Sequence, residues 1–167
     1  MRPSSLLRLA GIFLIALIAV NAASAFAAAN SVPSTRLDDD TLPITANNLK
    51  PSECAGINLT NIIVNGNGTA GNDLILGTAG GNTINGEGGA DCIVGGDGND
   101  RLSGSGGADV ILGGGGNDRL NGNQGNDTLF GGSGNDRLWG DLGTDVCDGG
   151  SGKDTGDATC ETEINIP

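Results

Sequence analysis

The sequence is poor in the side chains that most often carry out catalysis. Its 167 residues include no histidine and no tyrosine, with one tryptophan, one methionine and three phenylalanines. Histidine is the commonest general base, so its absence excludes a serine–histidine arrangement and the HExxH metalloprotease motif. It also excludes zinc sites built on imidazole. We therefore expect a protein that is not an enzyme.

Basic residues are scarce as well. Lysine and arginine number 8 against 20 aspartates and glutamates, so the formal net charge is −12 at pH 7. An acidic chain repels phosphate backbones and anionic lipid surfaces, so we expect neither nucleic acid nor membrane as a partner. The one long apolar run, 11–20, is shorter than the roughly 20 residues that a membrane-spanning helix needs, so no membrane span is expected.

Glycine, by contrast, is abundant and regularly placed. Residues 68–157 divide without insertion into ten nine-residue frames: GTAGNDLIL, GTAGGNTIN, GEGGADCIV, GGDGNDRLS, GSGGADVIL, GGGGNDRLN, GNQGNDTLF, GGSGNDRLW, GDLGTDVCD and GGSGKDTGD. Positions 1 and 4 are always glycine, and position 6 is aspartate in every frame but one, where Asn82 stands. A disordered glycine-rich linker has no such fixed phase, whereas a stacked repeat protein does.

Each frame predicts a six-residue turn followed by a three-residue strand. Because side chains alternate along a strand, position 8 points to one face and positions 7 and 9 to the other. The position 8 residues that we expect to point inward are Ile75, Ile84, Ile93, Leu102, Ile111, Leu120, Leu129 and Leu138. The ninth frame has Cys147 at this inward position, and the tenth has Gly156. A single strand cannot bury a core, but two frames per coil, stacked about 4.8 Å apart, can do so. Ten frames then make about five coils.

This stacking places like charges above one another. Odd frames align Asp73, Asp91, Asp109, Asp127 and Asp145 in one column, and even frames align Asp100, Asp118, Asp136 and Asp154 in another. Carboxylates about 4.8 Å apart repel by roughly 0.9 kcal/mol per pair in water, and more near a protein surface. The array carries too little positive charge to offset this repulsion. A hard divalent cation offsets it, and turns rich in carboxylates and carbonyls suit calcium.

The frames closely resemble the hemolysin-type (RTX) calcium-binding nonapeptide, G-G-x-G-x-D-x-U-x, where U is a large apolar residue. The resemblance implies an all-β fold, a parallel β-roll or β-helix-like solenoid, with several Ca²⁺ ions held between turns two frames apart by the position 6 aspartates and turn carbonyls. The implied metal ligands are Asp73, Asp91, Asp100, Asp109, Asp118, Asp127, Asp136, Asp145 and Asp154. Asn82 lacks the charge, so no ligand role passes to it, and Gly156 leaves the last frame without a strand residue at position 8.

The regions outside the array suggest export. Residues 1–27 combine Arg2 and Arg8, an apolar run and small residues, which is typical of a secretory signal peptide cleaved after Ala25 or Ala27; an uncleaved anchor is the alternative. Residues 28–52 are polar and proline-containing and are predicted to be a flexible N-terminal segment. Residues 53–67 contain a strand signal, Ile62 to Val64, predicted to cap the array, and 158–167 form a C-terminal cap or tail.

Four cysteines, Cys54, Cys92, Cys147 and Cys160, are present without a CxxC motif. In an exported chain an even number of cysteines indicates disulfides, and three connectivities are possible for four residues. We favour Cys54–Cys92 and Cys147–Cys160, because each bond then staples one end of the roll. Cys147 occupies an inward position, so its bond would also close the C-terminal end of the core.

The two outward faces differ in character. Even frames place an arginine at every eighteenth residue, Arg101, Arg119 and Arg137, which we interpret as charge relief among the aspartate columns. Odd frames place mostly apolar residues outward, including Leu74, Leu76, Val94, Val110, Leu112 and Phe130. An apolar face of this length favours a contact. The first interpretation is coverage by the chain's own N-terminal segment, and the second is a dimer or ligand surface.

Together these features predict a secreted, extracellular calcium-binding repeat protein with a structural or adhesive role. The mature chain, without the signal peptide, is expected to stay unfolded where calcium is low and to fold on binding several Ca²⁺ ions. The alternative is a calcium-dependent module that binds cell-surface polysaccharide or another protein through the apolar face of the odd frames.

Overall fold

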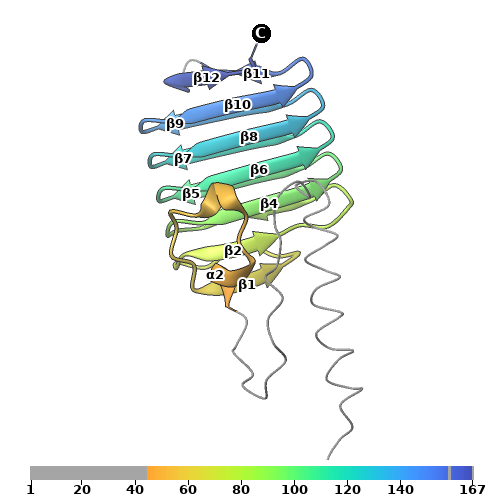
Figure 1. Cartoon of the computed structure of the whole chain (residues 1–167). Helices are drawn as coiled ribbons and strands as arrows, with labels where there is room; N and C mark the ends of the chain where they lie inside the picture. Colours follow the sequence, from red (N-terminus) through yellow and green to blue (C-terminus); the bar gives the residue numbers. More distant parts are fainter. Residues whose placement is uncertain (1–44, 158, 167) are drawn as a thin grey trace, which may run out of the picture.

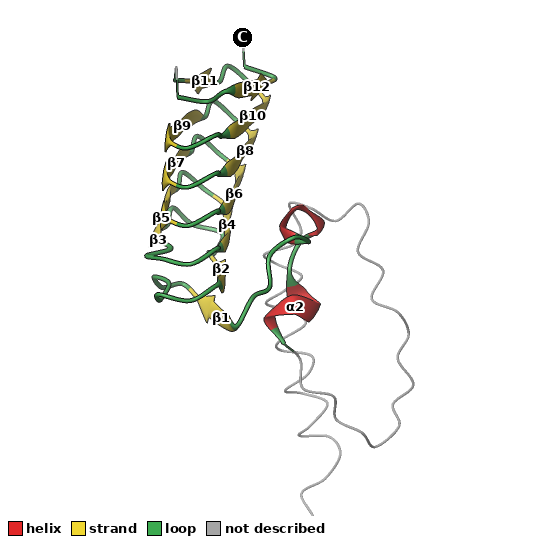
Figure 2. Ribbon diagram, turned by 90° about the vertical axis from the view of Figure 1, so that its left-hand side faces the viewer, coloured by secondary structure: helices red, strands yellow, loops and turns green. Residues whose placement is uncertain are grey.

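The computed structural model describes residues 45–157 and 159–166, so the predicted signal peptide and most of the predicted flexible segment lie outside the described residues. The described chain is an all-β solenoid in which parallel strands stack in two sheets, wound as five coils of two strands (Figures 1 and 2). In these described residues, helix is limited to one α-helical and one 3-10 turn. The predicted fold class is confirmed. Within the described residues, no helix has the length and apolar character needed to cross a membrane.

Odd and even frames build different sheets, as the alternation of frames predicts. The seven-stranded sheet contains, in spatial order, β1 (Asn61–Val64), β2 (Asp73–Leu76), β4 (Cys92–Asp97), β6 (Val110–Gly115), β8 (Thr128–Ser133), β10 (Val146–Ser151) and β12 (Thr162–Ile164). The five-stranded sheet contains β3 (Thr83–Asn85), β5 (Arg101–Gly106), β7 (Arg119–Gln124), β9 (Arg137–Leu142) and β11 (Thr155–Gly156). All neighbours are parallel, and within the array each residue pairs with the one eighteen positions later, as Ile93 does with Ile111.

The strands are longer than the frame predicts. From β4 to β10 each strand is six residues long, because it continues through the first three positions of the next frame. Gly96 pairs there with Gly114, and Ser105 pairs with Asn123, in the same register as the strands themselves. The turn backbones stack as regularly as the strands, so their N–H and carbonyl groups take part in the hydrogen bonds between neighbouring strands. Part of each predicted turn is therefore strand.

The core is a single file of inward side chains between the two sheets. It consists of the predicted position 8 residues Ile75, Ile84, Ile93, Leu102, Ile111, Leu120, Leu129, Leu138 and Cys147, together with Cys160. The eight aliphatic side chains are at most 2 % exposed. Burying each contributes roughly 1.5–3 kcal/mol. The disulfide Cys147–Cys160 lies in this cluster and closes its C-terminal end, as predicted.

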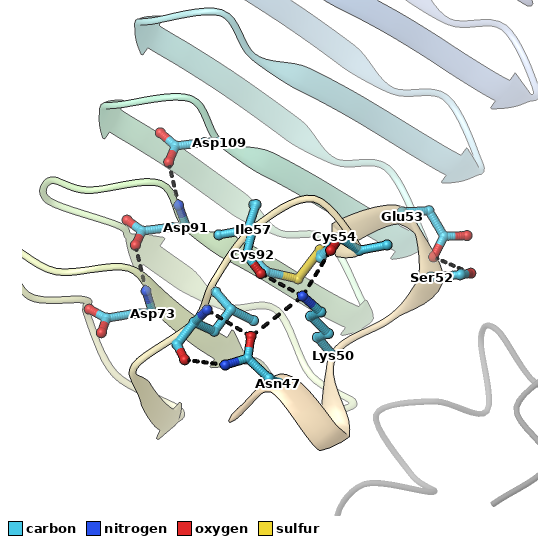
Figure 3. Close-up of a disulfide and its surroundings, with 12 residues drawn as sticks. Asn47, Lys50, Ser52, Glu53, Cys54, Ile57, Asp73, Asp91, Cys92 and Asp109 are labelled. Atoms are coloured by element: carbon cyan, nitrogen blue, oxygen red, sulfur yellow. Dashed lines mark hydrogen bonds between the residues drawn. A yellow bond between two sulfur atoms is a disulfide. The ribbon is translucent and has the colours of Figure 1, made fainter. Parts of the chain in front are cut away.

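The N-terminal segment covers the outer face of the seven-stranded sheet at its N-terminal end (Figure 2). A short helix α2 (Ala46–Leu49) and the 3-10 turn η1 (Ser52–Cys54) precede β1, and the disulfide Cys54–Cys92 ties this segment to β4 (Figure 3). The buried residues of the contact are Ala46, Cys54, Ile57, Leu59, Leu74, Leu76, Cys92, Val94 and Leu112. Both favoured disulfides are thus present, and the first interpretation of the apolar face, coverage by the chain itself, is confirmed.

Polar contacts order this segment from residue 45 onward, whereas the sequence predicts flexibility up to residue 52. The amide side chain of Asn47 pairs with the backbone of Leu59, donating to its carbonyl at 2.8 Å and accepting from its N–H at 2.9 Å. The Lys50 ammonium donates to the carbonyls of Ala55, at 3.0 Å, and Ile57 (Figure 3). The segment is ordered because these bonds and the apolar contact offset its conformational entropy.

Candidate metal site in the turns

The position 6 side chains form the two predicted columns, one along each edge of the roll. All are buried, at most 2 % exposed for the aspartates and 6 % for Asn82. The odd column runs through Asp73, Asp91, Asp109, Asp127 and Asp145, and the even column through Asn82, Asp100, Asp118, Asp136 and Asp154. An ionised carboxylate is costly to bury unless it is paired or bound to a metal. The structure therefore concentrates an electrostatic cost at these two edges.

One oxygen of each of eight position 6 carboxylates is satisfied by the preceding coil. The backbone N–H of Asp91 donates to Asp109 Oδ1 at 2.8 Å, and that of Asp109 donates to Asp127 Oδ1 at 2.8 Å. The same bond recurs along both columns, and Figure 3 shows its first two steps, from Asp73 to Asp91 and from Asp91 to Asp109. Each coil therefore uses a carboxylate of the next coil as an acceptor.

The second oxygen of the same carboxylates has no partner. Within the described residues, no hydrogen bond reaches the buried Oδ2 atoms of Asp91, Asp100, Asp109, Asp118, Asp127, Asp136, Asp145 and Asp154. A buried unsatisfied polar atom costs roughly 1–3 kcal/mol, and more when it is charged. Eight such atoms in regular array are more than a folded protein usually leaves without an additional ligand. Their chemistry, hard anionic oxygen, fits a divalent cation such as calcium.

The glycines at positions 1 and 4 make room for this arrangement. A Cβ on Gly104 would lie 2.2 Å from Asp109 Oδ2, so position 1 must be free of a side chain where the carboxylate turns inward. A Cβ on Gly107, at position 4, would lie 1.7 Å from the carbonyl oxygen of Gly89 in the coil before, and its φ of +128° strains any other residue. The repeated glycines therefore let the carboxylates and the turns stack closely.

Carboxylates alone cannot complete a calcium site here. Among the described residues, no group of three or more histidine, cysteine, aspartate or glutamate side chains converges on one point. From the second coil onward, each coil supplies one position 6 carboxylate to each column, so the remaining ligands of a calcium ion bound there would be backbone carbonyls of the turns. Calcium accepts six to eight oxygens and tolerates irregular geometry, which suits a site of this composition better than Mg²⁺.

Burial perturbs the titration of these carboxylates. Loss of solvation raises the pKa of Asp91, Asp109 and Asp118 to about 7 and that of Asp127 to about 6, with added repulsion from neighbouring carboxylates and a partly opposing backbone hydrogen bond. The same causes, desolvation first, raise the pKa of Asp100 and Asp136. Without a cation, the folded turns therefore favour protonated carboxylates at a pH where the unfolded chain is ionised.

The first two frames depart from this pattern. Asp73 Oδ2 accepts from the backbone N–H of Thr69 at 2.6 Å and from its hydroxyl at 2.8 Å. Asn82 occupies the corresponding place in the even column and is bonded within its own turn to Thr78. The structure places Asp73 in the predicted column, but its second oxygen is already satisfied. Its role as a metal ligand remains a prediction.

Sequence reasoning missed two further contributors. The position 5 asparagines form a second ladder, in which Asn99 Oδ1 accepts from the N–H of Asn117 at 2.7 Å and Asn117 Oδ1 accepts from Asn135 at 2.8 Å. The recurrence of asparagine at position 5 could have revealed it. Glu161 Oε2 accepts from the N–H of Asp145 at 2.6 Å, which ends the odd column. Glu161 follows Asp145 by sixteen residues and not eighteen, so the nonapeptide phase conceals it.

The family comparison agrees with this geometry. The model of the RTX calcium-binding nonapeptide repeat (4 copies) matches residues 67–102, 94–129 and 121–155, which together span more than half of the chain. No curated protein and no solved structure gives a significant match. The stacked glycine turns, the columns of aspartates and the matched segments show that this chain belongs to the family of RTX calcium-binding nonapeptide-repeat proteins, whose repeats bind calcium.

Proposed function

We propose that the protein is a secreted calcium-binding module that folds on binding several Ca²⁺ ions and serves a structural or adhesive role outside the cell. The observation that carries the proposal is the regular set of eight buried, unpartnered carboxylate oxygens. A bound calcium ion supplies positive charge and additional coordination at these oxygens. The position 6 aspartates of frames 3 to 10 bind it together with turn carbonyls, and the glycines hold the backbone open around them.

Folding and binding are coupled in this proposal. Without a cation, the two carboxylate columns oppose stacking, although the aliphatic core and the strand ladders favour it. A ligand that binds only the folded state shifts the equilibrium by mass action, and several sites multiply the effect. The calcium concentration then determines whether the coils stack.

The test is far-UV circular dichroism of the oxidised protein after treatment with chelator, titrated first with Ca²⁺ and separately with Mg²⁺. We expect a cooperative gain of β signal with Ca²⁺ and little gain with Mg²⁺ at the same concentration. Isothermal titration calorimetry of the same sample then counts the ions. Full β signal in chelator, unchanged by calcium, would show that the core and disulfides suffice and would refute calcium-coupled folding.

Two disulfides support an oxidising compartment, since such bonds are rare in the reducing cytosol. We propose that residues 1–27 direct export and are then removed. Expression of the full chain, followed by mass spectrometry of the N-terminus in the exported fraction, tests this. Protein that begins after Ala25 or Ala27 is the expected result, and an intact N-terminus retained in the membrane fraction would instead establish an anchor.

A second candidate function, binding of a polyanionic surface polymer, is favoured by the outer face of the five-stranded sheet. Arg101, Arg119 and Arg137 are exposed and directly paired in register, with Thr83 and Thr155 at the ends of their column. No carboxylate lies in this column, so the three charges repel one another, and a polyanion would relieve that repulsion. The apolar face proposed for a partner in the alternative above is in large part covered by the N-terminal segment.

Affinity electrophoresis in calcium tests this candidate with dextran sulfate as the polyanion and neutral dextran as the control. Retardation by dextran sulfate that is lost in Arg119→Ser is the expected result. Lys153→Ser removes one positive charge from an exposed turn outside the column and is the matched control. Equal retardation of both variants and of the unmodified protein would exclude the arginine column as the binding surface.

A further inference from the structure

The first two turns of the array have a different backbone from the other eight. In frames 3 to 10 the residues at positions 2 and 4 lie in the left-handed region, as Glu87 (φ +74°) and Gly89 (φ +102°) do in frame 3. In frames 1 and 2, which both begin GTAG, Thr69, Thr78 and the two position 4 glycines stay outside that region. A β-branched threonine disfavours positive φ, so the residue at position 2 and the shape of the turn change together.

In frame 1 the threonine satisfies the oxygen that is unpartnered elsewhere. Both the N–H and the hydroxyl of Thr69 donate to Asp73 Oδ2, at 2.6 and 2.8 Å. Asn61, in β1, donates its side-chain amide to the other oxygen, Asp73 Oδ1. The carboxylate therefore receives three donors from the protein, and it needs no cation to offset its burial.

In frame 2 an amide nitrogen lies where a cation would be expected. Asn82 Oδ1 accepts from the N–H of Thr78 at 3.2 Å and from its hydroxyl at 3.1 Å. Asn82 Nδ2 donates to the carbonyl of Thr78 at 3.0 Å, to the carbonyl of Gly80, and to Asp100 Oδ1 at 3.3 Å. Three oxygens from two successive turns thus converge on one NH₂ group. This is the set of ligand types, carbonyls and a carboxylate, that calcium takes in proteins.

The same end of the roll has further stabilising contacts with the segment that precedes the array. β1 extends the seven-stranded sheet beyond β2, and the N-terminal segment packs on Leu74 and Leu76. The disulfide Cys54–Cys92 ties that segment to the second coil (Figure 3). The first coil therefore combines closed turns with an outer face covered by a segment that is covalently held to the next coil.

We propose that the first coil, residues 68–85, is closed by threonine and asparagine without metal and serves as the folded template on which calcium assembles the remaining coils. The metal ladder then begins at Asp91 in the odd column and at Asp100 in the even column. In a repeat protein each unit contacts only its neighbours, so a preformed unit at one end removes the cost of nucleation and directs growth from that end. This inference rests on the calcium-dependent folding proposed above.

Hydrogen exchange of the full chain, measured by mass spectrometry in chelator and in calcium, tests the template. In chelator we expect protected amides in β1 to β3 and fast exchange from frame 5 onward, and in calcium we expect protection throughout. Fast exchange of the first coil in chelator, together with full protection in calcium, would overturn the template and leave the proposed function intact. Protection of the whole roll in chelator would overturn both.

A pair of substitutions tests the metal-free turn itself. Thr78→Gly with Asn82→Asp gives frame 2 the residues of the later frames, so we expect native mass spectrometry and calorimetry to count one additional calcium ion. The matched control is Asp118→Asn, which removes a carboxylate from mid-array and should lower the count by one. An unchanged count in the frame 2 variant, with the control lowered, would overturn the inference about Asn82. An unchanged count in Asp118→Asn as well would count against the proposed function.

Discussion

The core between the two sheets and the buried interior of the turns differ in whether they need a ligand from outside the chain. Between the sheets, eight aliphatic side chains at most 2 % exposed pack on one another and need no other group. Inside the turns of frames 3 to 10, eight carboxylate oxygens are equally buried and have no protein partner within the described residues. One nine-residue frame thus combines a self-sufficient part with a dependent one. In the proposed function, the core supplies the stability of the fold, and the turns make that stability depend on calcium.

Protonation should act on the turns alone, and it is expected to produce the largest effect because it acts on many carboxylates together. For Asp91, Asp109 and Asp118 the folded pKa is about 7, above the ordinary value of 3.8, so the folded state binds protons more tightly than the unfolded state. The resulting stabilisation is complete below the unfolded pKa and is lost as the pH rises through about 7. In chelator, acidification from pH 8 to pH 5 should therefore increase the β signal.

Circular dichroism across this pH range, with and without calcium, checks the prediction. In saturating calcium the signal should vary little between pH 7 and pH 8, since the ion then occupies the carboxylates. Calorimetry should show a calcium affinity that falls as the pH drops below about 7, because protons compete for the same oxygens. A chelated protein that unfolds further on acidification would contradict this account of the turns.

A methyl group placed in the turn stack should break the calcium-bound roll. Gly107→Ala brings a Cβ to 1.7 Å from the Gly89 carbonyl oxygen at a φ of +128°, so we expect a loss of about 4 kcal/mol from strain and overpacking. The adjacent Gly106→Ala meets its nearest atom, the carbonyl oxygen of Glu87, at 3.8 Å and should change the stability little. Urea unfolding of both variants in calcium measures the difference, and equal losses would argue against close stacking of the turns.

A core truncation should weaken the roll whatever fills the turns. Leu120 is fully buried, so Leu120→Ala should lower the free energy of unfolding by about 3 kcal/mol. Urea unfolding in calcium at pH 7, and in chelator at acid pH, should show losses of similar size. A loss that appears only in calcium would mean that the core and the turns are not separable.

A turn variant in frame 6, the frame of Leu120, should have effects of opposite sign in calcium and in chelator. Asp118→Asn removes a ligand and should lower the stability in calcium by about 2 kcal/mol, the scale of a hydrogen bond to a charged group. In chelator it removes a buried charge, so it should increase the β signal. Asp154→Asn, beside the two-residue strand β11, should have the same signs with a smaller effect in calcium. Equal effects at both positions would contradict the stacked-site arrangement.

The repetitive part of this molecule could be predicted from the sequence because period and phase determine it. A nine-residue period with an apolar position 8 is enough to place Ile93 above Ile75 and to sort odd and even frames into two sheets. The same frame positions favoured the disulfide pairing that is present. Cys147 falls on an inward position near one end of the roll, and Cys92 falls on the outer face near the other end. A periodic sequence fixes relations between residues far apart, which an ordinary globular sequence does not.

The features that escaped prediction are those that break the period. Thr69 and Thr78 are ordinary turn residues by composition, and only the contacts show that their hydroxyls donate to the position 6 side chains of their own turns. Glu161 lies out of phase, because the last turn is two residues shorter than the others. The order of residues 45–52 depends on a tertiary contact with the apolar face, and local polarity gives no sign of it.

The alternation of frames between two sheets also sets the unit in which such a chain can lengthen or shorten. Removal of one frame of nine residues would keep every glycine and aspartate in place, yet it would exchange the outward faces of all later coils. The arginines of the five-stranded sheet would then continue the face that Leu59 and Ile57 cover, and the apolar residues would face solvent. Removal of eighteen residues keeps both faces intact. We therefore expect natural variants of this array to differ in length by whole coils, so that eighteen residues, and not nine, is the unit of duplication and loss.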